Sequence, residues 1–154
     1  MNHLKLVLLG VLIFAIALRS FPEAREKNPV RVCRDDGSRI DYYLERVAPD
    51  ARSKELLLVL QGSDCNSVTT VKAMGVVRNV RPESDLLIVE KYGITERLPR
   101  SDLVERPDCP RKYLDNDCPG RRADDAVRVV SRLVAEYGYE RVVVIGGSEG
   151  ALVA

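Results

Sequence analysis

The chain has 154 residues, of which 45% are hydrophobic, 24 are basic and 23 are acidic, so its formal net charge is +1. This length suits a single folded domain, and the apolar content excludes an intrinsically disordered chain. The near balance of charges gives no electrostatic basis for binding nucleic acid or an anionic membrane surface.

Residues 1–24 are predicted to be a targeting segment and not part of the fold. Residues 1–5 form a short positive region, residues 6–18 are uncharged and almost wholly apolar, and Arg19 follows them. As a helix, the apolar run would span roughly 20 Å, less than the ~30 Å hydrocarbon core of a bilayer. We therefore expect a signal peptide and a periplasmic or secreted protein. The alternative is an uncleaved membrane anchor formed by residues 6–18, which would be the protein's only contact with a membrane.

Four cysteines follow this segment, namely Cys33, Cys65, Cys109 and Cys118. An even number of cysteines in an exported chain favours disulfides, and four cysteines allow three pairings. The sequence has no CxxC pair, and its single histidine is His3, so we expect no metal site. No motif implies a cofactor.

The folded region, residues 28–154, is expected to begin with an antiparallel hairpin. Its two strands, residues 30–34 and 40–45, alternate in character on either side of Asp36-Gly37. An Asp-Gly pair between two such runs is typical of a tight turn.

Three later segments, residues 56–60, 86–89 and 142–145, are continuously apolar. Such runs suit parallel strands that are covered on both faces. A poorly patterned helix is predicted between the first two, over residues 67–81, and a better one between the second and third, over residues 121–137. The apolar residues that recur at helical spacing in the latter are Ala123, Ala126, Val127, Val130, Leu133, Val134 and Tyr137. This order of elements predicts a doubly wound α/β fold.

The segment from Ile94 to Pro119 has four prolines and two cysteines and is expected to be a long ordered loop. Long loops in compact domains often carry function. Gly138 is expected to end the helix that follows this loop.

The last apolar strand runs into Gly146-Gly147-Ser148-Glu149-Gly150, a Gly-x-Ser-x-Gly pattern. A serine on a tight turn between a strand and a helix is how a hydrolase presents a nucleophile, and the flanking glycines prevent clashes where the two elements cross. One alternative is a glycine-rich turn with an incidental serine. Another is a phosphate-binding loop, although the sequence has neither a Walker pattern nor Gly-x-Gly-x-x-Gly at the start of a βαβ unit.

With this motif, the order of elements before it and Gln61-Gly62-Ser63 after residues 56–60, the chain resembles the N-terminal half of an α/β-hydrolase over residues 30–154. The resemblance implies an α/β-hydrolase-type doubly wound, mostly parallel sheet with an N-terminal antiparallel hairpin. It also implies that Ser148 is the nucleophile and that the main-chain N–H groups of Ser63 and Glu149 form the oxyanion hole. Each such donor is worth about 3 to 4 kcal/mol to an acyl-transfer transition state.

Two residues of these motifs have further interpretations. Gln61 stands where the family has a histidine, and an ordinary strand-ending turn at this place is the alternative to an oxyanion loop. Glu149 lies in the first turn of a helix, where the helix dipole favours a carboxylate, and that position could be its whole role.

The same resemblance places strands 56–60 and 86–89 side by side, with Cys65 close to the loop that follows the second. It therefore implies a disulfide from Cys65 to Cys109, or else to Cys118, which would brace the oxyanion loop. A local link between Cys109 and Cys118 is the main rival, and Cys33 is expected to be left over.

Four further residues near these motifs could be assigned to a catalytic site. Asp124 and Asp125 lie near the start of the helix before the motif, where acidic residues favour the helix dipole, whereas the family's acid follows its nucleophile. We therefore expect both to be structural. Lys91 and Tyr92 are expected either to line the mouth of the active site or to be solvated loop residues.

The resemblance implies hydrolysis of an ester, thioester or peptide through an acyl-serine intermediate, with a small-molecule or peptide acyl substrate. The family's remaining strands and its triad Asp and His are expected beyond residue 154, so we expect a domain truncated after its fifth strand. Residues 142–145 would then form an uncovered apolar edge, and these 154 residues alone would be inactive. The alternative is a non-catalytic secreted binding module with a hydrolase-like half-fold, which needs a partner to cover that strand.

Overall fold

The computed structural model describes residues 28–47, 53–71, 76–103 and 106–154. The predicted targeting segment lies outside these ranges. Within them, no helix is both long enough and apolar enough to cross a membrane. Five strands form one sheet in the order β1-β2-β4-β3-β5. Their bounds are Val30–Cys33 for β1, Arg39–Glu45 for β2, Glu55–Leu60 for β3, Asp85–Val89 for β4 and Arg141–Gly146 for β5.

The predicted N-terminal hairpin is present. Strands β1 and β2 pair antiparallel, and Val32 lies opposite Ile40 in their register. The turn between them needs a left-handed residue, which Gly37 supplies at φ +79°. The hairpin then continues the sheet, because β2 also pairs antiparallel with β4.

The other three strands of the sheet, β4, β3 and β5, are parallel. Strand β3 pairs parallel with β4 on one side and with β5 on the other. The sheet as a whole is therefore mixed, an antiparallel hairpin followed by three parallel strands. Leu60 lies opposite Gly146 in the register of β3 and β5, so the segments that leave these two residues start at the same edge of the sheet.

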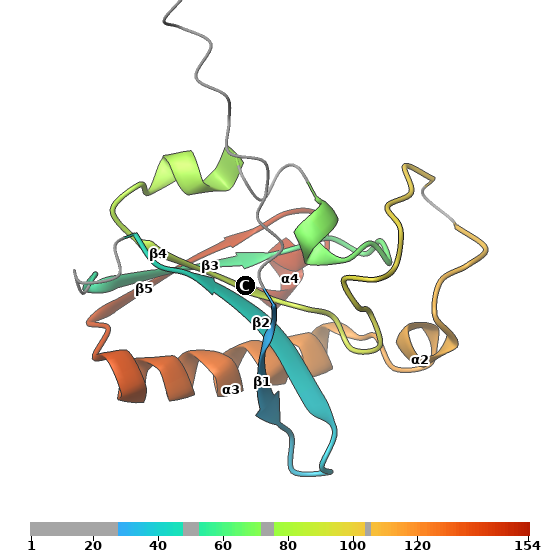
Figure 1. Cartoon of the computed structure of the whole chain (residues 1–154), viewed down its shortest axis with the longest axis horizontal. Helices are drawn as coiled ribbons and strands as arrows, with labels where there is room; N and C mark the ends of the chain where they lie inside the picture. Colours follow the sequence, from blue (N-terminus) through green and yellow to red (C-terminus); the bar gives the residue numbers. More distant parts are fainter. Residues whose placement is uncertain (1–27, 48–52, 72–75, 104–105) are drawn as a thin grey trace, which may run out of the picture.

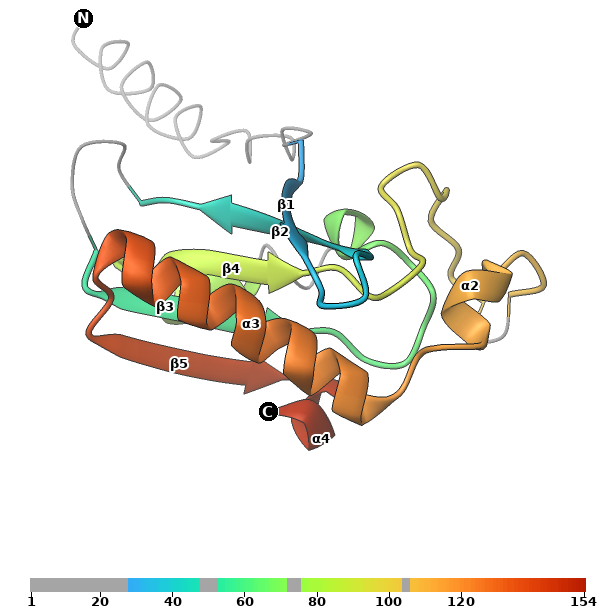
Figure 2. The same ribbon diagram turned by 90° about the horizontal axis from the view of Figure 1, so that it is seen from below.

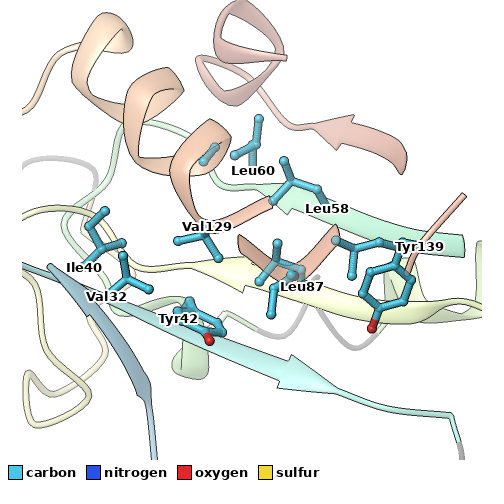
Figure 3. Close-up of a cluster of buried hydrophobic side chains, with 11 residues drawn as sticks. Val32, Ile40, Tyr42, Leu58, Leu60, Leu87, Val129 and Tyr139 are labelled. Atoms are coloured by element: carbon cyan, nitrogen blue, oxygen red, sulfur yellow. The ribbon is translucent and has the colours of Figure 1, made fainter. Parts of the chain in front are cut away.

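Apolar clusters lie on both faces of the sheet, as a doubly wound fold requires. Helix α3, Pro119–Tyr137, lies along one face (Figure 2) and packs on the larger cluster (Figure 3). On the opposite face, Val77 packs against Leu57, Val59 and Leu86 beside the short helix η2, Arg78–Val80 (Figure 1). The side chains of the larger cluster include Val32, Ile40, Tyr42, Leu58, Leu60, Leu87, Val129 and Tyr139.

Helix α3 matches the predicted helix in place and length but not in every buried position. It begins at Pro119, where proline's missing N–H costs nothing, and Gly138 follows it in the left-handed conformation at φ +71°. Val127, which the spacing assigned to the apolar face, is 64% exposed, and Val129 is fully buried in its place. The prediction for Val127 was wrong because the buried face of α3 is centred on Ala126, Val129 and Leu133, and at about 100° per residue Val127 lies on the other side of the helix.

The single helix predicted over residues 67–81 is not formed. Val68–Thr70 is a short helix, η1, and the next residue, Val71, is extended at φ −85° and ψ 106°. Residues 72–75 lie outside the described ranges, Val76 and Val77 are helical, and helix η2 continues from them at Arg78. The Ser67 side chain accepts a hydrogen bond from the Thr69 N–H and caps the first turn, and the extended Val71 ends the helix after three residues.

Strand β5 is the last strand of the sheet in the described part of the chain, and its apolar side chains are partly exposed. Val142 and Val144 are 36% and 39% exposed, whereas every residue of β3 is buried. After β5 comes the short helix α4, Gly150–Val153. The predicted long loop, residues 94–119, contains one short helix among its described residues, α2, Arg111–Leu114.

Candidate active site

The turn between β5 and α4 holds Ser148 in a strained conformation. Its φ is +54°, and among the described residues it is the only non-glycine residue with a positive φ. Such strain in a residue with a side chain costs of order 1–3 kcal/mol and gathers at functional sites. The turn is closed by the Gly150 N–H, which donates to the Gly147 carbonyl at 2.9 Å, and by the Ala151 N–H, which donates to the Ser148 carbonyl at 2.9 Å. The geometry is that of a nucleophile elbow.

The outer glycines of the motif are required by close backbone contacts. A Cβ atom on Gly146 would lie closer than 3.0 Å to the Gly150 carbonyl. A Cβ atom on Gly150 would lie equally close to the carbonyls of Leu60 and Gln61. The glycines are therefore required, as the pattern predicted, by the close crossing of β5 and α4. The end of β3 also takes part in this crossing.

The Gln61–Asp64 segment lies directly beside Ser148. The Gly147 N–H donates to the Leu60 carbonyl at 3.1 Å, which joins the elbow to the end of β3. A Cβ atom built on Gly62 would be 3.2 Å from the Ser148 Cβ and 3.7 Å from its Oγ. The structure thus brings together the two motifs that the sequence separates by more than eighty residues.

A polar cavity of about 360 Å³ opens at this junction. Ser148, Gly62, Ser63 and Asp64 line it on one side, and residues 100–103 line it on another. In the described part of the chain, no acceptor is found for the main-chain N–H of either Ser63 or Glu149. Ser63 lines the cavity, and Glu149 is the next residue after Ser148.

Buried Arg122, from the first turn of α3, connects the two motifs. Its guanidinium pairs with the Glu149 carboxylate, Nη1 to Oε2 at 2.9 Å, and its Nη2 donates to the Gln61 carbonyl. Glu149 therefore does more than favour the helix dipole, because its side chain takes part in this bridge. Sequence reasoning missed Arg122, since nothing in the local pattern of a helix start marks an inward-pointing arginine.

Lys91 was expected either to line the mouth of the active site or to be a solvated loop residue, and the structure shows neither. It is 4% exposed, and it is not among the described residues that line the cavity. Its Nζ donates to the Gly62 carbonyl at 3.0 Å and also to the Asp64 carbonyl. Burial lowers the pKa of its ammonium, while the Asp64 carboxylate opposes that shift. Tyr92 is half-buried, and Arg34 and Arg121 each lie over its ring at 4.6 Å from the centroid.

Glu90, the residue after β4, is a further buried charged group of this region. It is 3% exposed, and its carboxylate accepts hydrogen bonds from the Ser67 hydroxyl at 2.5 Å and from the N–H of Val68 at 3.2 Å. Burial raises its pKa to about 7, although these hydrogen bonds act in the opposite direction.

Cys65 and Cys109 form a disulfide, with their Cα atoms 5.8 Å apart. Cys65 is buried in a small cluster with Ile94 and Tyr113, immediately behind the Gln61–Asp64 segment. Cys33 and Cys118 are free and exposed. The link ties the segment beside Ser148 to the long loop after β4.

Asp124 and Asp125 do not line the cavity. Asp124 is exposed, and Asp125 forms a two-point ion pair with Arg34 of the hairpin, at 2.6 Å and 2.5 Å. The Asp125 carboxylate therefore holds α3 to the hairpin.

No histidine lies among the described residues, so none of them can serve as a histidine base for Ser148. The only histidine of the 154 residues, His3, lies outside the described ranges. Within those ranges, no group of three or more His, Cys, Asp or Glu side chains could hold a metal ion.

No protein-family model matches the chain, and no curated protein matches it in sequence. Solved structures do match. A cold-adapted esterase from an Arctic intertidal metagenomic library has a TM-score of 0.62 at 17% identity, over 80% of this chain and 51% of that one. An α/β serine hydrolase homologue from Coxiella burnetii has a TM-score of 0.58 at 9% identity, over 82% and 54%. An α/β serine hydrolase without a lid from Xanthomonas campestris has a TM-score of 0.51 at 12% identity, over 84% and 54%. At these identities the likeness shows the fold, and this chain spans about half the length of each of these structures.

Proposed function

Because the chain has an α/β-hydrolase-like fold, we propose that it carries the nucleophile and the oxyanion hole of a serine hydrolase. The observation that carries the proposal is the position of Ser148, strained at φ +54° on the elbow, with Gly62 beside its hydroxyl and a cavity in front of it. In this reaction the Ser148 Oγ attacks the carbonyl carbon of an ester, thioester or peptide. The proton of the hydroxyl passes to a base, and the leaving group departs as the acyl-serine forms.

The oxyanion of the tetrahedral intermediate would be held by the main-chain N–H groups of Ser63 and Glu149. Two observations support these donors. Ser63 lies in the cavity wall with Ser148, and Glu149 follows Ser148 on the elbow. Main-chain donors that need no rearrangement stabilise such charge strongly, because they are already oriented before the reaction.

The base and the acid of the triad would come from polypeptide outside the described residues. This part of the proposal follows from the histidine count and from the roughly half-length coverage of the similar structures. A serine hydroxyl without a base is a weak nucleophile, so we expect the 154 residues alone to show no Ser148-dependent turnover.

An exported location is part of the proposal. It is supported by the apolar run of residues 6–18 and by the Cys65–Cys109 disulfide, because disulfides persist in oxidising compartments. Fractionation of the expressing cells, with N-terminal sequencing of the product, would test it. A cytoplasmic protein that retains Met1 would contradict it.

The catalytic proposal can be tested on the 154-residue chain by supplying the base as free imidazole. The chain and its Ser148→Ala variant are incubated with p-nitrophenyl acetate, and acetylated serines are located by peptide mass spectrometry. Ser101→Ala is the matched control, because Ser101 lines the same cavity. We expect imidazole to promote acetylation of Ser148 at least tenfold over any other serine, and Ser101→Ala to leave that acetylation unchanged.

Two results would contradict this account. Acetylation of Ser148 no faster than that of Ser101 would reject Ser148 as a nucleophile. Turnover that depends on Ser148 without added imidazole would reject the expectation that the chain lacks a base.

A further inference from the structure

Three successive carbonyl groups of the Gln61–Asp64 segment accept hydrogen bonds from two buried side chains. The Lys91 ammonium donates to the carbonyls of Gly62, at 3.0 Å, and of Asp64. The Tyr113 hydroxyl donates to the carbonyl of Ser63 at 2.5 Å and lies 3.4 Å from that of Asp64. Lys91 and Tyr113 are 4% and 5% exposed.

These bonds determine where the N–H groups of the segment point. The described residues contain no cis peptide bond, and in a trans peptide the carbonyl of one residue and the N–H of the next point in opposite directions. A Gly62 carbonyl that faces Lys91 therefore turns the Ser63 N–H to the other side. The cavity with Ser148 lies against this segment, and neither Lys91 nor Tyr113 is among the described residues that line it.

The two donors are themselves held firmly. The Lys91 Nζ lies 5.3 Å from the centre of the Tyr113 ring and 3.7 Å from the Asp64 carboxylate. Tyr113 packs with the disulfide-bonded Cys65 in a small buried cluster. Helix α2, which carries Tyr113, comes so close to Gly93 that a Cβ atom there would lie 2.6 Å from the Tyr113 main-chain nitrogen.

Burying an ammonium group destabilises the folded state unless the group is well paired. The Lys91 ammonium is paired with main-chain carbonyls beside the elbow. We propose that Lys91 and Tyr113 are positioning residues for the oxyanion of a substrate bound to Ser148. Lys91 orients the Ser63 N–H through the Gly62 carbonyl, and Tyr113 holds the next peptide group through the Ser63 carbonyl, so that Ser63 keeps this orientation. This proposal rests on the proposed function. It predicts that the two side chains act on the transition state and not only on stability.

The test uses Tyr113→Phe, which removes one hydroxyl, and Lys91→Met, which removes the ammonium at similar length. Tyr139→Phe is the matched control. It also removes a buried tyrosine hydroxyl, which donates to Asp85 at 2.6 Å, but that hydroxyl lies away from the Gln61–Asp64 segment. Acylation of Ser148 in imidazole is compared for p-nitrophenyl acetate and its thiono analogue, in which sulfur replaces the carbonyl oxygen. Sulfur is a weak hydrogen-bond acceptor, so only the oxygen ester gains fully from the oxyanion hole.

We expect Tyr113→Phe and Lys91→Met to slow acylation by the oxygen ester about tenfold, less than the about 10²–10³ lost when a donor is removed outright. Acylation by the thiono ester should change little, and Tyr139→Phe should affect neither. Equal slowing of both esters would overturn the proposal, because it would show a general structural defect. Unchanged rates for the oxygen ester in Tyr113→Phe would also overturn it.

A second measurement separates this proposal from the catalytic one. Residual dipolar couplings of ¹⁵N-labelled chain report the orientation of the Ser63 and Asp64 N–H bonds without any reaction. We expect these couplings to change in Tyr113→Phe and to stay constant in Tyr139→Phe. Constant couplings in both variants would overturn the positioning role whether or not Ser148 reacts, whereas changed couplings without acylation would reject only the proposed function.

Discussion

The buried carboxyl group of Glu90 predicts a pH-dependent stability. Its pKa rises from the ordinary value of 4.5 to about 7 because the group is buried. A raised pKa means that the folded state binds the proton more tightly than the unfolded state does. The stabilisation is therefore fully present below pH 4.5 and is lost as the pH rises through 7. The free energy of unfolding should fall over this window.

The size of the effect follows from the two pKa values. One pKa unit corresponds to about 1.4 kcal/mol, so the whole shift is worth about 3 kcal/mol. At pH 5 the carboxyl group is already mostly ionised in the unfolded state, which leaves about 2.5 kcal/mol between pH 5 and pH 8. Carboxylates with lowered pKa values, such as Asp36 and Asp108, affect the free energy of unfolding only below pH 5.

Urea unfolding followed by circular dichroism at several pH values would measure this slope. In Glu90→Gln the slope should flatten, because the amide does not titrate. The control is Glu83→Gln, because the Glu83 side chain is 64% exposed. Any contribution of His3 is common to all three proteins and cancels. A wild-type free energy of unfolding that is constant from pH 5 to pH 8, or a slope that survives in Glu90→Gln, would refute the reasoning.

Three substitutions test other features of the fold by the same unfolding assay. Ser148→Gly should raise the free energy of unfolding by about 0.5 to 1 kcal/mol, because glycine adopts φ +54° without strain, and a decrease would contradict the strain. Gly150→Ala should lower it by about 1 to 3 kcal/mol through the clash with the end of β3, and full stability would reject that close contact. Asp125→Ala should cost about 1 to 3 kcal/mol because the half-buried Arg34 loses its carboxylate but keeps its hydrogen bonds to Ser38 and to the Arg39 carbonyl, and a loss below 1 kcal/mol would show that this pair is dispensable.

Local sequence patterns predicted the parts of this protein that depend on neighbouring residues. The hairpin turn at Gly37, the end of α3 at Gly138 and the elbow around Ser148 each need a backbone conformation that a few adjacent residues determine. The resemblance singled out the Gln61–Gly62–Ser63 segment after β3, and the parallel register of β3 and β5 places that segment beside the elbow.

Patterns failed where several local choices were equally good. Valines at 127, 129 and 130 all suit a helix that packs on a sheet, and only the packed structure shows that Val129 takes the buried position. The apolar residues of 67–81 were compatible with one helix, but the extended Val71 divides the segment.

Glycine spacing and strand composition are local properties, so the amino-acid pattern was enough to place a serine on a tight turn after a buried strand. The residues that surround that serine could be identified only from the folded chain. Tyr113 contacts Ser63 across 50 residues, and Arg122 contacts Gln61 across 61. Partners so distant along the chain are selected by the order of strands in the sheet and by the path of the loop between β4 and α3. No short pattern encodes that path, which is why Lys91, Tyr113 and Arg122 emerged only once the chain was folded.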